Sequence, residues 1–233
     1  ELTLGNSRIT TLSDGNLVLP MEFLLGNLPA ADAAPVLAHY GITGDTVEPP
    51  CNLTLFQDAE RTVLFDAGPG SGLMTKRKAP MLTVEKVRDY IESIGAERAS
   101  FAVGAARRLA AIEDLMEFID GGQEVLPGIL AHDTPGHTPG HMAFEIRQGT
   151  EAALVVGDAI GNGHLAFARP DWASGSDQDA ETGIATRTQL LDQLATDQMA
   201  MVGFHLPGGG LGRVERDGET FEAAPAKADA EQF

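Results

Sequence analysis

Hydrophobic and polar residues alternate over several short stretches in the first third of the chain, as they do in half-buried β-strands. The stretches that predict strands are residues 8–14, 16–25, 52–57 and 61–65. The first two are separated by the turn pair Asp14-Gly15, and the last two are near enough in sequence to form a hairpin. The N-terminal part of the chain therefore predicts a β layer.

Other stretches have the apolar spacing of an amphipathic helix. They are residues 83–94, 102–119 and 182–198. Residues 30–40 predict a further short helix, which Gly41 would close and Pro35 would make irregular.

Strand patterns return after Gly121-Gly122. They cover residues 124–131, 142–147, 152–156 and 199–204, and a hairpin-like stretch follows at residues 212–221. This order of strands and helices predicts an α/β fold, a sheet sandwich with helices outside. Residues 1–233 are interpreted as one domain, with residues 223–233, rich in Ala, Glu and Asp, as a flexible tail.

The composition supports a single globular domain and narrows its partners. Hydrophobic residues make up 43% of the 233 residues and charged residues 21%, values typical of a folded protein. The net charge of −18 would repel phosphate backbones, so nucleic acid is not expected as a partner. Cys51 is the only cysteine, which excludes an intrachain disulfide and a cysteine-based zinc knuckle.

No apolar run in the sequence has the length of a membrane helix, so we expect a soluble protein without a membrane partner. The chain begins at Glu1 rather than Met, as expected of a processed N-terminus. If a signal peptide preceded Glu1, the protein would be periplasmic or secreted, and otherwise it would be cytoplasmic. A homo-oligomer is compatible with the sequence.

The strongest chemical signal is the motif Asp-Thr-Pro-Gly-His-Thr-Pro-Gly-His at residues 133–141, which contains His137 and His141. Its prolines and glycines exclude a helix, so the motif predicts a rigid loop after the preceding strand. Such a loop holds an imidazole in a fixed direction, which favours His137 as a metal ligand over an ordinary turn histidine. His141 is expected to pack or to hydrogen-bond behind the ligands.

Three further polar residues stand at the ends of apolar strands, namely Asp66, Asp158 and His205. A carboxylate at the end of a buried strand needs a cation or hydrogen-bond donors to offset its desolvation. Taken singly, Asp158 is equally well explained as a turn or helix-cap residue, and a strand-end histidine such as His205 is more often structural.

Taken together, the order Asp66, His137, Asp158, His205 resembles the metallo-β-lactamase superfamily. The motifs that carry the resemblance are Asp-x-Gly, the repeated Thr-Pro-Gly-His, the Gly-Asp strand end and the late histidine. The opening stretch and the Gly-Phe-His-Leu-Pro stretch are most similar to the branch that contains lactonases and methyl parathion hydrolase. The resemblance covers residues 4–72 and 101–221 and implies an αββα sandwich.

The resemblance also implies the site. His137 would bind a first metal, Asp158 would bridge two metals and orient the attacking water, and His205 would bind the second. Asp66 would be a carboxylate behind the ligands, and His164 would either face the substrate or be an ordinary loop histidine. One or two zinc ions are implied, which lower the pKa of a bound water so that hydroxide attacks a carbonyl or phosphoryl centre.

The His-x-His-x-Asp-His motif of the family is absent from its expected place. No histidine occurs between Tyr40 and Ala131, and residues 73–100 predict a helix rather than the strand that would carry the motif. The remaining ligands would be divided between two sites, so we expect weak or substoichiometric zinc. Three explanations stay open: the sequence omits a segment, a strand-helix segment was deleted or replaced, or the protein has abandoned zinc hydrolysis.

The sequence therefore predicts a zinc-dependent hydrolase of small-molecule esters, lactones or related substrates, with activity impaired by the missing motif. The alternative is an inactive or redesigned scaffold of the same fold that binds a ligand or partner. A nuclease of the superfamily is disfavoured by the net charge of −18.

Overall fold

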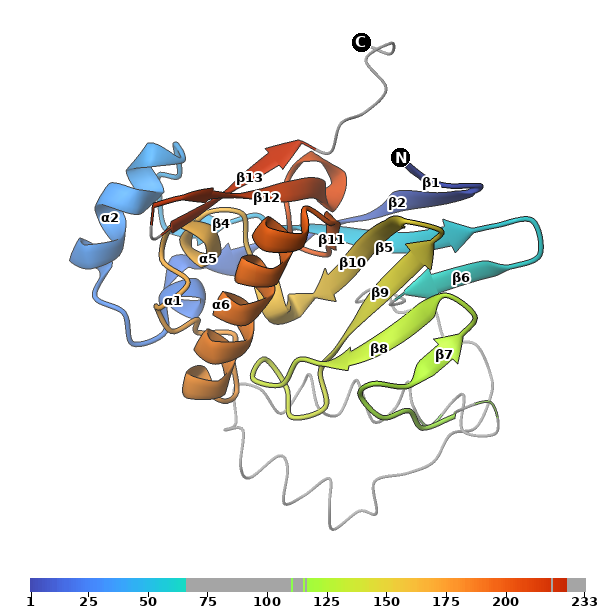
Figure 1. Ribbon diagram of the computed structural model, residues 1–233. Coiled ribbons are helices and arrows are strands. Elements are labelled where there is room, and N and C mark those ends of the chain that lie inside the picture. The colour runs from blue at the N-terminus through green and yellow to red at the C-terminus, as the bar shows by residue number, and fades with distance from the viewer. Residues whose placement is uncertain (66–109, 111–114, 116, 219, 226–233) are drawn as a thin grey trace. The chain divides into compact units, whose positions relative to one another are not determined.

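The computed structural model describes residues 1–65, 110, 115, 117–218 and 220–225 of the chain. The described residues form two β-sheets that share an apolar core, and α6 lies against the other face of the larger sheet (Figure 1). The arrangement is a mixed α/β sandwich.

The smaller sheet is antiparallel and has the strand order β1-β2-β5-β6. Its strands are β1 (Leu2–Leu4), β2 (Ser7–Asn16), β5 (Pro50–Gln57) and β6 (Thr62–Phe65). The larger sheet has the order β13-β12-β11-β10-β9-β8-β7. Its strands are β7 (Glu124–Leu126), β8 (Ile129–Asp133), β9 (Met142–Gln148), β10 (Glu151–Gly157), β11 (Ala200–Gly203), β12 (Leu211–Asp217) and β13 (Thr220–Pro225).

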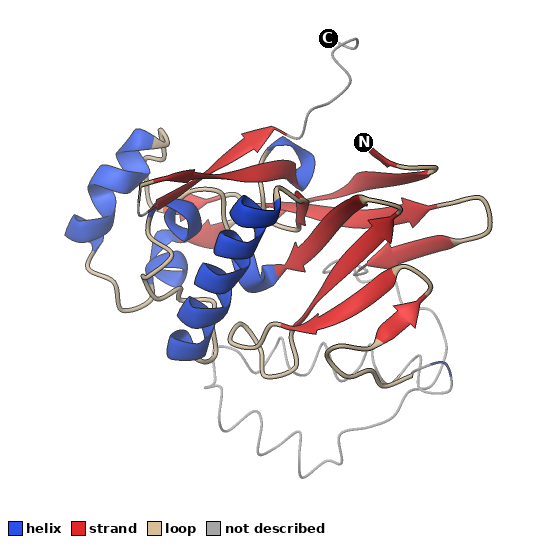
Figure 2. Ribbon diagram, viewed as in Figure 1, coloured by secondary structure: helices blue, strands red, loops and turns tan. Residues whose placement is uncertain are grey.

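Helices and a small ribbon complete the described part. The helices are α1 (Met21–Leu25), α2 (Ala30–His39), α5 (Leu165–Ala168) and α6 (Ala180–Asp197), with 3-10 turns η3 (Asp158–Ile160) and η4 (Gly208–Gly210). The ribbon pairs β3 (Leu19–Pro20) with β4 (Thr46–Val47). Figure 2 shows α1, α2 and α5 close together at one end of the sheets, where they share a small apolar cluster.

Strand β10 is buried on both of its faces. Ala153 and Val155 point into the core between the sheets, whereas Leu154 and Val156 point into the core beneath α6. The inter-sheet core also contains Leu4, Ile9, Phe56, Ile129, Ile146, Ala200 and Val202. The core beneath α6 also contains Leu190, Leu191, Leu194, Met201 and Val214. A strand covered on both sides reads as a continuous apolar run, which is the pattern in the sequence.

The β10–β11 pair is parallel, whereas the other described pairs of the larger sheet are antiparallel. Parallel strands end at the same edge of a sheet, so the residues that follow them become neighbours. Asp158 follows β10 directly, and His205 follows β11. The chain between them contains α6, which begins after Asp179, whose side chain accepts a hydrogen bond from the backbone N–H of Thr182 at 3.0 Å.

Several predicted elements are confirmed. These elements occur where the sequence predicts them: the hairpin of β5 and β6, helices α2 and α6, strands β9 to β11, and the hairpin of β12 and β13. Strand β13 runs through Pro225, which includes the first residues of the predicted tail, and residues 226–233 lie outside the described part. Three further predictions also concern residues outside the described part. They are the helix at residues 83–94, most of the helix at residues 102–119, and the segment 73–100 that stands in place of the missing motif. Of the helices that are described, none is long and apolar enough to cross a membrane.

The prediction of a turn at Asp14-Gly15 followed by a strand at residues 16–25 is wrong. Gly15 has φ +85°, and the register between β2 and β5 shifts here, so the chain forms a bulge and continues in the same strand. Helix α1 follows because its residues bury against α2 and α5, a tertiary contact that local alternation does not reveal.

The prediction of one strand at residues 124–131 is also wrong. Two strands, β7 and β8, pair antiparallel around Pro127-Gly128. Gly128 has φ +78°, and proline followed by glycine is the usual sequence of a tight turn of this kind.

Candidate metal centre

The Pro-Gly-His loop between β8 and β9 holds His137 in a fixed position. The backbone N–H of Thr134 donates to the carbonyl of His141 at 3.0 Å, which closes the loop. Gly136 has φ +129°, and a Cβ there would stand 2.4 Å from the Cα of Gly183 at the start of α6. Only glycine fits this close approach, so the sequence fixes where the loop meets α6.

His141 supports the backbone of Asp158. Its Nε2 accepts a hydrogen bond from the backbone N–H of Asp158 at 3.0 Å, so the neutral ring carries its proton on Nδ1. That proton is donated to Oγ1 of Thr134 at 2.7 Å. Burial lowers the pKa of His141, while the charge of Asp158 opposes this shift, so the ring is neutral. Gly157 leaves room for the contact, because a Cβ there would lie 2.7 Å from Nε2 of His141.

His205 is held from the smaller sheet. Its Nδ1 donates to the carbonyl of Pro50 in β5 at 2.7 Å. Asn52, also in β5 and buried, donates from Nδ2 to the carbonyl of Leu206 at 2.9 Å. The backbone N–H of Asn52 donates to the carbonyl of Phe204 at 2.9 Å. Both residues that flank His205 are therefore bound to the same strand.

The structure brings His137, Asp158 and His205 together. Nε2 of His137 lies 3.5 Å from Oδ2 of Asp158, and Nε2 of His205 lies 3.4 Å from Oδ1. The two imidazoles thus face different oxygens of one carboxylate. Within the described part of the chain, Oδ1 of Asp158 is buried and has no hydrogen-bond partner.

This arrangement fits a cation. The proton of His205 is on Nδ1, so the lone pair of Nε2 faces a carboxylate oxygen, and two acceptors repel at this distance unless a cation or proton lies between them. A zinc ion bound at about 2.1 Å to a nitrogen and an oxygen in tetrahedral geometry would hold those atoms about 3.4 Å apart. Both measured distances match that separation.

The described residues supply only part of a complete site. Among them, no group of three or more His, Cys, Asp or Glu side chains forms a cluster around one ion. This agrees with the two imidazoles facing separate oxygens of Asp158. The described residues give each of two ions one imidazole and one carboxylate oxygen, and a structural zinc ion needs four ligands.

The structure does not bring His164 into this group of proposed metal ligands. His164 precedes α5 and lies half-buried beside Tyr40, with ring centroids 6.2 Å apart. Burial lowers the pKa of His164 to about 4, so its imidazole is neutral at pH 7. A substrate contact of His164 stays a prediction, and Asp66 lies outside the described residues.

Sequence patterns did not identify Asp177 and Arg187, which lie behind His137. Arg187 is 3% exposed, and its Nη1 lies 3.2 Å from Oδ2 of Asp177. One signal was available: Arg187 stands in the apolar stripe of α6 with Leu190, Leu191 and Leu194, all buried. An arginine in an apolar stripe requires a buried acceptor.

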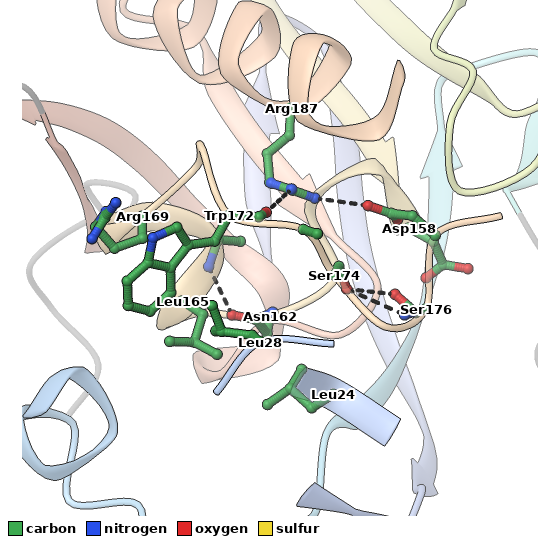
Figure 3. Close-up of a pocket in the computed structure, with 14 residues that line it drawn as sticks. Leu24, Leu28, Asp158, Asn162, Leu165, Arg169, Trp172, Ser174, Ser176 and Arg187 are labelled. Atoms are coloured by element: carbon green, nitrogen blue, oxygen red, sulfur yellow. Dashed lines mark hydrogen bonds and ion pairs between the residues drawn. The ribbon is translucent and has the colours of Figure 1, made fainter. Parts of the chain in front are cut away.

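A pocket opens beside Asp158. Its apolar wall comes from α1 and the residue stretch after it, from α5, and from the loop that follows α5; these residues are Leu24, Leu28, Leu165 and Trp172. Asn162, Ser174 and Ser176 add polar groups to the lining, and Asp158, Arg169 and Arg187 add charged ones (Figure 3). The pocket therefore combines an apolar wall with charged and polar side chains.

No family model matches the chain, and neither does any curated protein. Solved structures do match. One is AidC, a dizinc quorum-quenching lactonase in complex with a product, with 20% identity, 97% of both chains covered and a TM-score of 0.79. Another is the hydrolase AbOPH of the beta lactamase superfamily, with 17% identity, 98% of this chain and 97% of that chain covered, and a TM-score of 0.81.

A probable metal-dependent hydrolase from Staphylococcus aureus also matches, with 17% identity, 97% of this chain and 99% of that chain covered, and a TM-score of 0.68. The chain therefore has the metallo-β-lactamase fold, which confirms the predicted fold class. At these identities the likeness shows the fold alone, and one fold can carry many different activities.

Proposed function

We propose that this chain is a metal-dependent hydrolase of small-molecule lactones, esters or related compounds, with His137, Asp158 and His205 as zinc ligands. The observation that carries the proposal is the position of Asp158 between two imidazoles, at 3.5 and 3.4 Å from their Nε2 atoms. A zinc ion bound there would supply a Lewis acid and lower the pKa of a water molecule.

The residues of the chain have separate roles in this proposal. Asp158 orients the attacking water and holds its proton through the carboxylate oxygens. His137 and His205 present Nε2 toward different oxygens of that carboxylate. His141 fixes the backbone of Asp158 through the 3.0 Å hydrogen bond, so the carboxylate keeps its direction.

The apolar wall of the pocket beside Asp158 favours a substrate that has an apolar part. Leu24, Leu28, Leu165 and Trp172 would bury an apolar substituent while its ester or lactone carbonyl lies near Asp158. AidC, which has the same fold, is a lactonase in complex with a product, and this favours lactones within the proposed class.

A second candidate is a scaffold of the same fold that binds a ligand without turnover. The observation that favours it is the lack of any histidine between Tyr40 and Ala131, where the family places further ligands. Both candidates predict weak zinc binding, because the described residues offer each ion only one imidazole.

Metal analysis of protein purified without chelator tests the ligand set. We expect fewer than two zinc ions per chain, lost on dialysis against a weak chelator. Two tightly held ions per chain would show that the site is complete and that the proposed ligands are insufficient to describe it.

Activity separates the two candidates. A panel of lactones, aryl esters and phosphotriesters should be assayed with and without added zinc. We expect zinc-stimulated hydrolysis of one class and its loss by orders of magnitude in Asp158→Asn. The matched control is Asp171→Asn, since Asp171 is an exposed loop aspartate whose carboxylate pairs with Arg169. Equal rates in Asp158→Asn and Asp171→Asn would refute the enzyme and leave the scaffold.

A further inference from the structure

Asp177 is a buried carboxylate in the loop before α6, with its side chain 4% exposed. A carboxylate so far from water requires partners on both of its oxygens. Oδ2 accepts from Nη1 of Arg187 at 3.2 Å. Oδ1 faces Nδ1 of His137, 3.8 Å away. The imidazole of His137 therefore lies between two carboxylates, Asp177 at Nδ1 and Asp158 at Nε2.

Arg187 fixes Asp177 from inside the fold. Its Nη2 donates to the carbonyl of Trp172 at 2.7 Å and its Nε to the carbonyl of Pro170 at 3.3 Å, as Figure 3 shows for Trp172. Two neutral acceptors and one carboxylate bind the guanidinium, and among the described residues Asp177 is the only carboxylate within ion-pair distance of it. The carboxylate is thus held in place independently of His137.

The same segment also holds the backbone around His137. The N–H groups of Gln178 and Asp179 both donate to the carbonyl of Gly136 at 3.0 Å. Oγ1 of Thr186 donates to the carbonyl of Pro135 at 2.6 Å. The segment that carries Asp177 therefore also holds the backbone of the loop that carries His137.

We propose that Asp177 is a positioning residue, which holds the proton of His137 on Nδ1 and so leaves Nε2 open to a divalent cation. The inference rests on the proposed function, because the cation is the one proposed above. The 3.8 Å separation is longer than a hydrogen bond, and such contacts shorten when the site is loaded. Nδ1 of His205 is directed in another way, by a 2.7 Å hydrogen bond to the neutral carbonyl of Pro50.

Asp177→Asn makes the inference testable, because an amide has one oxygen. The buried guanidinium of Arg187 would take that oxygen, and the amide NH₂ would then face Nδ1 of His137. The proton would move to Nε2 and block it. We expect nitrogen NMR of metal-free protein to show the Nδ1–H form of His137 in the unsubstituted chain and the Nε2–H form in Asp177→Asn.

Zinc affinity provides the second readout. Competition with a chromophoric chelator should show affinity about 10- to 100-fold lower in Asp177→Asn, as is typical when a carboxylate behind a metal-bound histidine is lost. Asp171→Asn is the control and should match the unsubstituted chain. A merely structural Asp177 would change unfolding but leave the tautomer and the affinity of the folded protein unaltered, which would overturn the inference.

The two proposals fail differently. If the unsubstituted protein binds no zinc, the proposed function falls, while the tautomer of metal-free His137 still decides the role of Asp177. If Asp177→Asn does not fold, the unsubstituted protein decides alone: Nδ1–H supports the inference and Nε2–H overturns it.

Discussion

Asn52 joins the two sheets at the site, and its removal has a predictable effect. The side chain is 5% exposed, and Nδ2 donates to the carbonyl of Leu206 at 2.9 Å and approaches that of Gly203 at 3.5 Å. Asn52→Ala leaves the Leu206 carbonyl, in a residue that is 2% exposed, without this donor. The loop that carries His205 then loses one of its side-chain hydrogen bonds to β5, while the bond from Nδ1 of His205 to the carbonyl of Pro50 remains.

The magnitude follows from these contacts. The 3.5 Å contact lies at the limit of a hydrogen bond and adds little, so the 2.9 Å bond dominates. Leaving a buried carbonyl unsatisfied costs about 1–3 kcal/mol, and we expect about 2 kcal/mol for Asn52→Ala. In a chain of this size, that loss lowers Tm by about 4–8 °C.

Urea unfolding of metal-free protein, followed by circular dichroism, measures this loss. The matched control is Asn16→Ala, which removes an exposed side-chain bond to the carbonyl of Glu48 at 3.3 Å. We expect a change below about 0.5 kcal/mol for the control, as for most surface substitutions. Equal stability of Asn52→Ala and Asn16→Ala would refute the reasoning, because the buried bond would then be worth no more than the exposed one.

Three further predictions concern pH and backbone geometry. Burial lowers the pKa of His164 from 6.5 to about 4, so the unfolded chain binds the proton first as the pH falls. Stability should drop between pH 6.5 and pH 4 by at most about 3 kcal/mol, and His164→Gln should flatten that part of a urea-unfolding profile. Hydrogen bonds from the backbone and side chain of Thr182 lower the pKa of Asp179 below 3.8, so its stabilisation is present above pH 3.8 and is lost as the pH falls through the folded pKa. Asp179→Ala should therefore lower Tm at pH 7, and the difference should vanish in acid. Gly157→Ala combines φ +54° with a Cβ 2.7 Å from His141, so calorimetry should show a loss of about 1–3 kcal/mol or more.

Two of these have a matched control. For His164 it is His39→Gln, which replaces an exposed histidine and should leave the drop between pH 6.5 and pH 4 in place. Gly149→Ala places a Cβ at φ +62° with nothing within 4 Å, so it isolates backbone strain from the clash. If Gly149→Ala is as damaging as Gly157→Ala, the contact with His141 contributes nothing. If the stability of His164→Gln depends on pH as that of the unsubstituted chain does, the prediction for His164 is wrong. If Asp179→Ala still has a lower Tm than the unsubstituted chain in acid, the prediction for Asp179 is wrong.

The sequence predicted what local pattern determines. The apolar runs of β10 and β11 indicate strands because both are buried on both faces, and the Pro-Gly pairs around His137 can only form a loop. The structure places His137, Asp158 and His205 side by side, while their metal role stays a prediction.

Distant contacts were not predictable in the same way. Helix α1 exists because Leu25 buries against Ala33 and Leu165, far along the chain. The role proposed for Asp177 depends on its contacts with Arg187 and His137, and no local sequence spacing indicates these contacts. Arg187 in an apolar stripe was the one sign that a buried acceptor had to exist.

The double burial of β10 and β11 also bears on how the molecule opens. Amides in strands covered on both faces exchange with solvent only through global unfolding, whereas edge strands such as β7 and β13 open locally. Asp158 and His205 follow β10 and β11, which we expect to exchange most slowly, so their spacing should survive partial opening of the fold. Leu24 and Leu28, in and after the short helix α1, lie on a peripheral segment of the pocket wall. In the proposed hydrolase, substitutions in that wall would change the preference for one substrate over another, while the carboxylate and the imidazole at the strand ends keep their separation.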